Sequence, residues 1–211
     1  MPLDNFDNLK AEVVSYSGRN DIANKLNAII GIVESRIFAN QHEGLRIRQM
    51  QTRSTASMST TDRFLALPSD FIEMRKLVAY PSTNTNDRWE LMFQTPAQMV
   101  VKDAVTRPSQ FAVTSQIEFD LTPDQAYTAE MQYWGRATAL SDAEPTNDIL
   151  TNYPDIYLFG CLWMVAKYGN EPDVAGIYYD DFIQAIRGAN QENKSGRYGP
   201  TMTRRVKGCN P

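Results

Sequence analysis

The sequence predicts an α+β protein: a helical bundle formed by N- and C-terminal helices, with an inserted antiparallel β lobe and an extended C-terminal arm. Three observations support this fold class. Apolar residues recur at helical spacing near both ends, they alternate between about residues 62 and 135, and no core pattern follows Asn193. We therefore expect a bundle from residues 1–45 plus 140–192, a β-rich insertion at 46–139 and a basic arm at 193–211.

Two helices are expected before residue 45. The first runs from Phe6 to about Tyr16, with Asp4 or Asn5 as its N-cap and Gly18 just past its end. The second begins near residue 20 and carries a continuous apolar stripe, which comprises Ile22, Leu26, Ile29, Ile30, Val33 and Ile37. Both stripes must be buried against another part of the chain.

The middle of the chain has β character. Residues 46–61 are polar and predict an extended arm or edge strands. Five or six antiparallel strands are expected between residues 62 and 135, centred on 64–67, 74–80, 89–93, 111–113, 117–121 and 127–134. A hairpin turn is expected at 114–116, and Thr95 followed by Pro96 predicts a short helix.

Helical spacing returns after Pro145. A short turn is expected at 147–152, followed by a helix that begins at Pro154 and ends at Gly169. Asp173 is expected to cap a last helix. The expected apolar stripes are Ile156, Phe159, Trp163 and Ala166 in the first of these helices, and Val174, Ile177, Tyr178, Phe182, Ala185 and Ile186 in the second.

Composition excludes several classes of protein. The chain is long enough for a substantial core, and its 42% apolar and 22% charged residues are typical of globular proteins. No apolar run is long enough for a membrane span, and the first residues do not resemble a secretory signal. Cys161 and Cys209 are too few for a disulfide scaffold, which favours assembly in a reducing cytoplasm.

Positive charge is concentrated at the C-terminus. Residues 193–211 contain five basic residues and no acid; because the chain carries −4 and this segment +5, residues 1–192 carry −9. Such a tail can bind a protein partner, bind nucleic-acid phosphates, or only keep the chain soluble. The candidate binding residues are Lys194, Arg197, Tyr198, Arg204, Arg205, Val206 and Lys207.

Motifs for catalysis and metal binding are missing from the sequence. The only histidine, His42, lies in a predicted loop, and no zinc, calcium or phosphate-binding motif occurs. Asp180–Asp181, Asp142 with Glu144, and Asp155 are candidate paired carboxylates for glycoside hydrolysis. Adjacent helical residues point in different directions, so Asp180–Asp181 favours a solvated face. We expect neither enzymatic activity nor a cofactor.

Tyrosines gather near the last two predicted helices. Core packing is the simpler explanation for them. The alternative is a subunit interface, because tyrosine provides a large amphipathic contact area. The candidate interface residues are Tyr153, Tyr157, Tyr178 and Tyr179.

The order of four segments resembles the head–tail adaptor (head completion or connector) proteins of tailed bacteriophages. These segments are the helix from Arg19 to Ile37, the Leu-Pro-Ser-Asp-Phe motif at 67–71, the segment from Met131 to Asp142, and Asn147 to Gly169. The last contains Tyr-Pro-Asp-Ile-Tyr-Leu-Phe-Gly at 153–160. The resemblance extends over roughly residues 1–190, while the basic tail matches only as an extended arm.

This resemblance implies a structural virion protein at the head–tail junction. Such subunits associate into a ring, commonly of twelve copies, beneath the portal protein; the ring extends the DNA channel and receives the tail or nozzle protein. DNA then passes through without sequence-specific binding, and no membrane is involved. The arm from about Lys194 to Pro211 would anchor the ring on the portal.

Three alternatives remain at this point. The chain could be a tail-tube or nozzle ring subunit, which would bind a tail protein before a portal. It could be a DNA-binding accessory protein that uses the basic arm. It could also be a cell-wall hydrolase that uses paired carboxylates.

Overall fold

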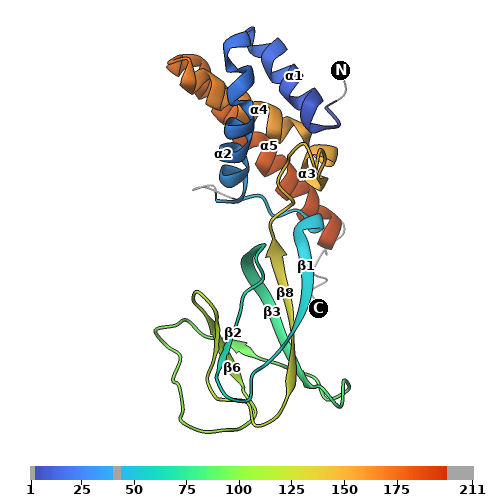
Figure 1. Cartoon of the computed structure of the whole chain (residues 1–211), viewed down its shortest axis with the longest axis vertical. Helices are drawn as coiled ribbons and strands as arrows, with labels where there is room; N and C mark the ends of the chain where they lie inside the picture. The colour runs from blue at the N-terminus through green and yellow to red at the C-terminus, as the bar shows by residue number, and fades with distance from the viewer. Residues whose placement is uncertain (1–2, 40–43, 199–211) are drawn as a thin grey trace, which may run out of the picture. The chain divides into compact units, whose positions relative to one another are not determined.

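The computed structural model describes residues 3–39 and 44–198, with side chains as far as Lys194 (Figure 1). It confirms the α+β class, since helices lie at both ends of the described chain and two sheets lie between them. The chain divides into a helical unit, within residues 1–48 and 137–211, and a β unit, residues 49–136. The sequence predicts these boundaries at 45/46 and 139/140.

Helix α1 (Phe6–Ser17) forms as expected. The Asn5 side chain caps it by accepting a hydrogen bond from the Asn8 N–H at 2.8 Å. Gly18 ends it in the left-handed region at φ 65°, which glycine adopts without a steric penalty. Phe6 is buried with Leu9 and Val13, whereas Tyr16 is exposed.

The second expected helix forms as two elements. A 3-10 helix, η1 (Asn20–Lys25), leads into α2 (Leu26–Phe38). Every residue of the predicted stripe is buried, which confirms the predicted face: Ile22, Leu26, Ile29, Ile30, Val33 and Ile37.

Helix α4 (Pro154–Tyr168) is the centre of the helical unit. It packs against α1, α2 and α5, and against α3 (Asp148–Asn152), a short helix where the sequence predicts only a turn. The packing is tight at Gly160, where an added Cβ would lie 2.6 Å from Val33 Cγ1 and 3.1 Å from a Phe182 ring carbon. Glycine at this position therefore lets α2 and α5 pack closely on α4.

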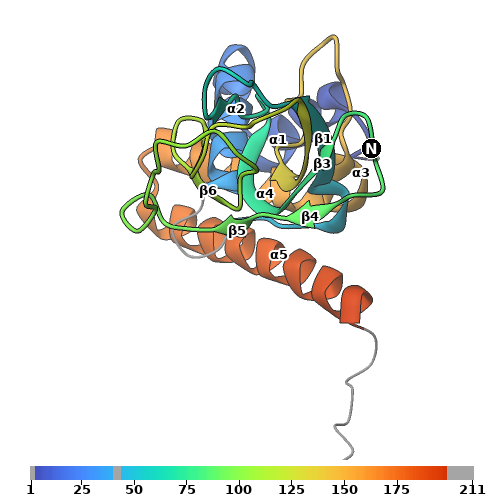
Figure 2. The same ribbon diagram turned by 90° about the horizontal axis from the view of Figure 1, so that it is seen from below.

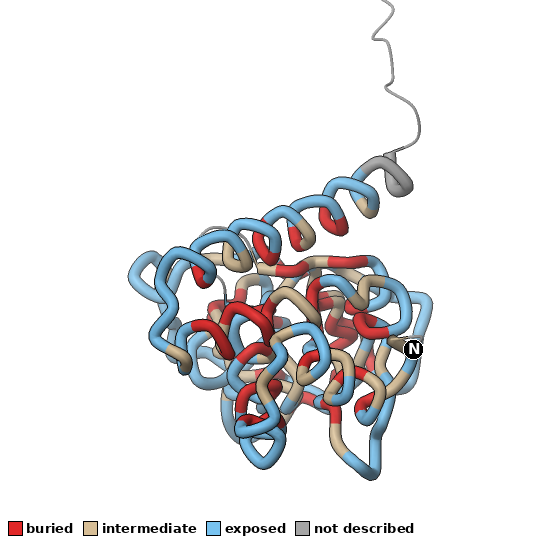
Figure 3. Tube along the Cα trace, turned by 90° about the horizontal axis from the view of Figure 1, so that it is seen from above, coloured by how far each residue is buried: buried red, intermediate tan, exposed pale blue. Residues whose placement is uncertain are grey.

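Helix α5 (Pro172–Tyr198) corrects two predictions. It continues six residues into the predicted arm, so residues 193–198 are helical rather than extended, and it reaches beyond α4 in Figure 2. Its buried face is also rotated relative to the predicted stripe, because Val174 and Ile177 are exposed. The buried apolar positions are Ala175, Phe182, Ile183, Ile186 and Ala189 (Figure 3).

Two asparagines hold the second half of α5 against the segment that follows α2. Asn190 Oδ1 accepts from the Arg46 N–H at 2.8 Å, and Asn190 Nδ2 donates to the Gly44 carbonyl at 3.2 Å. One turn later, Asn193 Oδ1 accepts from the Arg48 N–H at 2.9 Å. These bonds pair backbone groups that would otherwise be left unpaired at the edge of the core.

A polar network joins α2, α4 and the segment before α3. The Tyr157 hydroxyl donates to Glu34 Oε1 at 3.1 Å and accepts from Asn147 Nδ2 at 2.8 Å. The same Glu34 oxygen accepts from the Leu140 N–H at 2.8 Å. Burial raises the pKa of Glu34, although both hydrogen bonds favour its ionised form.

The β unit contains two four-stranded sheets. One has the order β1-β8-β3-β4 and is antiparallel: β1 (Gln51–Ser57), β8 (Tyr127–Gly135), β3 (Phe71–Pro81) and β4 (Trp89–Glu90). The other has the order β2-β7-β6-β5: β2 (Phe64–Leu65), β7 (Ile117–Phe119), β6 (Gln110–Val113) and β5 (Met92–Phe93). The 3-10 helix η2 (Arg48–Met50) precedes β1.

One apolar core lies between the two sheets. Strands β3 and β8 contribute Leu77, Met131 and Tyr133, and β6 and β7 contribute Phe111 and Phe119. The expected hairpin is confirmed, because Val113 pairs with Ile117 across residues 114–116. Polar β1 is an edge strand, as one of the two sequence interpretations proposed.

The β lobe departs from the predictions in three details. The sheets are not entirely antiparallel, since β5 pairs with β6 in parallel. The strand expected at 89–93 divides at buried Leu91 into β4 and β5, which belong to different sheets and leave Phe93 exposed. Thr95 begins a single turn rather than a helix, with Gln98 and Met99 N–H groups donating to its carbonyl.

A buried carboxylate closes the open end of the β6–β7 hairpin. Asp120 Oδ1 accepts from the N–H groups of Ser109 and Gln110, each at 3.0 Å, and Oδ2 accepts from the Ser109 hydroxyl at 2.8 Å. Asp120 is 3% exposed, so its carboxylate depends on these donors in place of water.

Asp120→Ala should destabilise the β unit by about 1–3 kcal/mol, because it removes the three hydrogen bonds that the carboxylate accepts from Ser109 and Gln110. Urea unfolding followed by tryptophan fluorescence would measure the loss. Asp103→Ala, in an exposed bend, is the matched control and should change little. Equal stability of the two variants would show that the Asp120 hydrogen bonds do not stabilise the hairpin.

Glu34→Gln should preserve the network, because one oxygen accepts both hydrogen bonds and glutamine retains it. A raised folded-state pKa means that the folded state binds the proton more tightly, so wild-type stability is lost as pH rises through that pKa. Glutamine does not titrate, so Glu34→Gln does not lose stability in this way as pH rises. Its free energy of unfolding relative to wild type should therefore increase between about pH 4 and pH 7.

Urea unfolding followed by helical circular dichroism would measure this difference at each pH. Glu144→Gln, at an exposed carboxylate in the same unit, is the control. A difference between Glu34→Gln and wild type that stays constant with pH would contradict the assignment.

Candidate interaction surfaces

The predicted arm lies only partly within the described residues. Lys194 is an exposed residue of α5. Arg197 and Tyr198 belong to the last turn of the same helix, where only the backbone is described. Arg204, Arg205, Val206 and Lys207 lie outside the described residues, as do His42 and Cys209.

Tyr153 joins the start of α4 to the far end of α5. Its half-buried hydroxyl accepts from Asn193 Nδ2 at 2.9 Å and donates to Glu192 Oε2 at 3.2 Å. Burial raises its pKa, with the Asn193 hydrogen bond acting in the opposite direction. The residue is therefore committed to contacts within its own subunit, with part of its ring left on the surface.

Tyr157 corrects the predicted interface. Its side chain is 0% exposed, and its hydroxyl is committed to the network with Glu34 and Asn147. Burial is the main cause of its raised pKa. A side chain without exposed surface cannot contact a neighbouring subunit, so Tyr157 belongs to the core.

Tyr178 lines a small groove between α1, α4 and α5. The groove has a volume of about 80 Å³, and its other walls include Leu162, Val165 and Val174. The Tyr178 ring meets Tyr16 edge to face, with centroids 6.3 Å apart. Burial raises the pKa of Tyr178.

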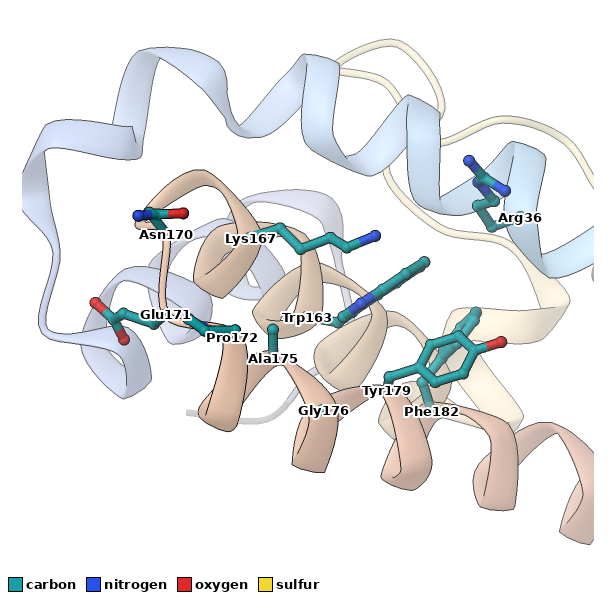
Figure 4. A pocket seen from close by; sticks show the side chains of 10 residues that line it. All are labelled: Arg36, Trp163, Lys167, Asn170, Glu171, Pro172, Ala175, Gly176, Tyr179 and Phe182. Atoms are coloured by element: carbon teal, nitrogen blue, oxygen red, sulfur yellow. The ribbon is translucent and has the colours of Figure 1, made fainter.

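Tyr179 lines a much larger groove of about 530 Å³, which we call the aromatic trough (Figure 4). Helix α4 contributes Trp163 and Lys167 to it, α2 contributes Arg36, and α5 contributes Gly176, Tyr179 and Phe182. The Trp163 ring lies 4.9 Å from the Tyr179 ring and stacks on Phe182 at 6.0 Å. Lys167 Nζ lies 4.5 Å from the centre of the Trp163 ring.

Tyr178 and Tyr179, although adjacent in the sequence, thus line two different grooves. Sequence analysis identified this part of α5 through its tyrosines, but it missed Arg36, Lys167 and Gly176. Arg36 lies far along the chain from the others, and no local pattern connects it to them. Only the packing of α2 beside α4 brings these side chains to one groove.

Apolar side chains are exposed on both units. On the helical unit they include Val174 and Ile177 of α5, which are 38% and 62% exposed. On the β unit they include Phe64, Met92, Phe93, Val100, Val101 and Val105. Exposed apolar side chains become candidate contact points for a partner where they lie together on one face.

The candidate catalytic carboxylates do not form a pocket. Asp180 and Asp181 are exposed on α5, and Asp142 lies 3.4 Å from Lys10 in an exposed ion pair. Cys161 is fully buried, which raises its pKa and makes it a poor nucleophile.

The described residues offer neither a cluster of metal ligands nor a membrane-spanning helix. Within residues 3–39 and 44–198, no three histidine, cysteine or acidic side chains come together as possible metal ligands. The helices in the same ranges include none with the length and apolarity required to cross a bilayer.

Comparison with known proteins identifies the family. A search of curated proteins finds no match. The family model of the SU10 adaptor protein matches residues 4–205, which cover both units and part of the basic tail. This match over nearly the whole chain shows that the protein belongs to the SU10 adaptor family of phage head–tail adaptors, and the α+β fold agrees with it.

Proposed function

We propose that the chain is the head–tail adaptor subunit of a tailed phage: copies form a ring beneath the portal, extend the DNA channel and provide the attachment site for the tail. The observation that carries this proposal is the family match over residues 4–205. The role is structural, not enzymatic, and belongs to the virion, with assembly in the host cytoplasm.

Exposed apolar side chains support association between copies. Val174 and Ile177 lie on the surface of α5, and Tyr178 and Tyr179 line the two grooves beside them. Water contact with such groups is unfavourable, so a partner that covers them gains free energy. We retain Tyr153, Tyr178 and Tyr179 as interface candidates.

The charge distribution supports a DNA channel. Residues 1–192 carry −9, so DNA would meet mostly repulsive charge and pass without sequence-specific binding. The basic residues Arg204, Arg205 and Lys207 are concentrated beyond α5. We propose that these three, with Lys194, Arg197, Tyr198 and Val206, bind the portal.

Deletion of residues 199–211 should abolish portal binding and leave the fold intact. The described helices and strands all end before residue 199, while the deletion removes three of the five C-terminal cations. Co-sedimentation of the purified chain with portal rings would measure binding, and circular dichroism would report the fold. Deletion of residues 208–211, which removes no charge, is the matched control.

Other outcomes favour other functions. A 199–211 deletion that still co-sediments with portal rings contradicts the arm assignment. Binding to a tail protein but not to the portal favours a tail-tube or nozzle subunit. Filter binding to DNA that is strong at 50 mM salt and falls steeply at 200 mM favours a DNA-binding accessory role.

A further inference from the structure

The aromatic trough lies beside α4, between α2 and α5. Trp163 and Lys167 of α4 lie between Arg36 of α2 and the α5 residues Gly176 and Tyr179 (Figure 4). Its volume of about 530 Å³ is large enough to enclose several side chains. Half-buried Tyr179 and Trp163, which is 8% exposed, form its aromatic wall, and Trp163 stacks on the buried Phe182 ring.

Two cations lie at this groove. Arg36 and Lys167 are both exposed, and neither forms an ion pair with another residue in the described part of the chain. Glu171 is the one acid among the lining residues, so these three side chains sum to +1. The trough therefore favours an occupant that combines an apolar group with negative charge.

A surface that combines an apolar side chain with negative charge lies on the outward face of α5. Ile177 is 62% exposed, and Asp173, Asp180 and Asp181 are exposed around it. These aspartates are four residues before, three after and four after Ile177, so all three are its neighbours on the helix surface. We call Asp173, Ile177, Asp180 and Asp181 the acidic ridge.

We propose that the acidic ridge of one copy docks into the aromatic trough of the next copy. This inference rests on the proposed ring and specifies which surfaces form its subunit contact. Ile177 would lie against the aromatic wall, and the aspartates would approach Arg36 and Lys167. Burial of Ile177 and neutralisation of the carboxylates then favour the same arrangement.

The positions of the two surfaces suit a ring. Successive residues of a helix point about 100° apart, so Ile177 points about 160° away from Tyr179, which lines the trough two residues later. Each copy therefore offers one ridge and one trough on different faces. Such heterologous contacts join copies head to tail and can close into a ring.

Gly176 supplies an independent observation. A Cβ added there would meet nothing within 4 Å, so packing within the subunit does not require glycine. Glycine within a helix is destabilising relative to alanine. At the side of the trough, the absent side chain leaves room for the ridge of a neighbouring copy.

Gly176→Met tests the contact without disturbing the fold. The new side chain should obstruct the trough, weaken self-association about tenfold or more, and leave the melting temperature unchanged or raised. Gly188→Met is the matched control, since Gly188 is another helical glycine of α5 with nothing within 4 Å of an added Cβ. It lies about 18 Å further along the helix. Sedimentation equilibrium of the purified full chain gives the dissociation constants.

Charge reversal supplies a second test. Asp180→Lys with Asp181→Lys makes the ridge basic, and Arg36→Glu with Lys167→Glu makes the trough acidic. Each double variant alone should associate at least about tenfold more weakly, because like charges then meet. An equimolar mixture should recover association, since each altered surface then meets an opposite charge on its partner.

The inference is overturned if Gly176→Met associates as the wild type does, if the mixture does not recover, or if the wild type stays monomeric at every concentration. Failure of the proposed function is separately visible, because portal co-sedimentation by the wild-type chain tests it directly. A chain that self-associates but does not bind portal rings would contradict the adaptor role without contradicting the ridge–trough contact.

Discussion

Burial of α4 is the constraint on which the helical unit depends. This helix is too apolar to remain in water, and its partners come from both ends of the chain: α1 and α2 before the β unit, α3 and α5 after it. The packing at Gly160, between Val33 and Phe182, brings α2, α4 and α5 together. The β unit is therefore an insertion in the sequence between two segments of the same bundle.

Apolar burial brings the helices together, and hydrogen bonds select their arrangement. An apolar stripe tolerates small rotations and sliding of one helix on another. The Tyr157 hydroxyl, in contrast, forms hydrogen bonds with both Glu34 and Asn147, and these require one arrangement. Asn190 and Asn193 impose the same requirement between α5 and the segment after α2. The surface left between α2 and α5, the aromatic trough, takes its form from this arrangement.

Sequence reasoning succeeded where a local pattern reports directly on structure. The α2 stripe, the Asn5 cap, the 114–116 hairpin and the family resemblance are confirmed. It failed where a residue's environment depends on distant parts of the chain. The sequence predicts Tyr157 as an interface residue in the same way as Tyr179. In the structure, however, α2 and the segment before α3 cover Tyr157.

The sequence by itself determined the α+β class, the placement of a β segment between two helical segments, the family, and the separation of a basic tail from an acidic body. Tertiary structure alone decided that 89–93 divides between two sheets, that Ile177 faces outward, and that Arg36 joins Trp163 and Lys167 at one groove. The physical reason is the separation along the chain over which each interaction acts. Periodicity and capping act over a few residues and show which face of an element is apolar. Which neighbour covers that face depends on contacts between residues far apart in the chain.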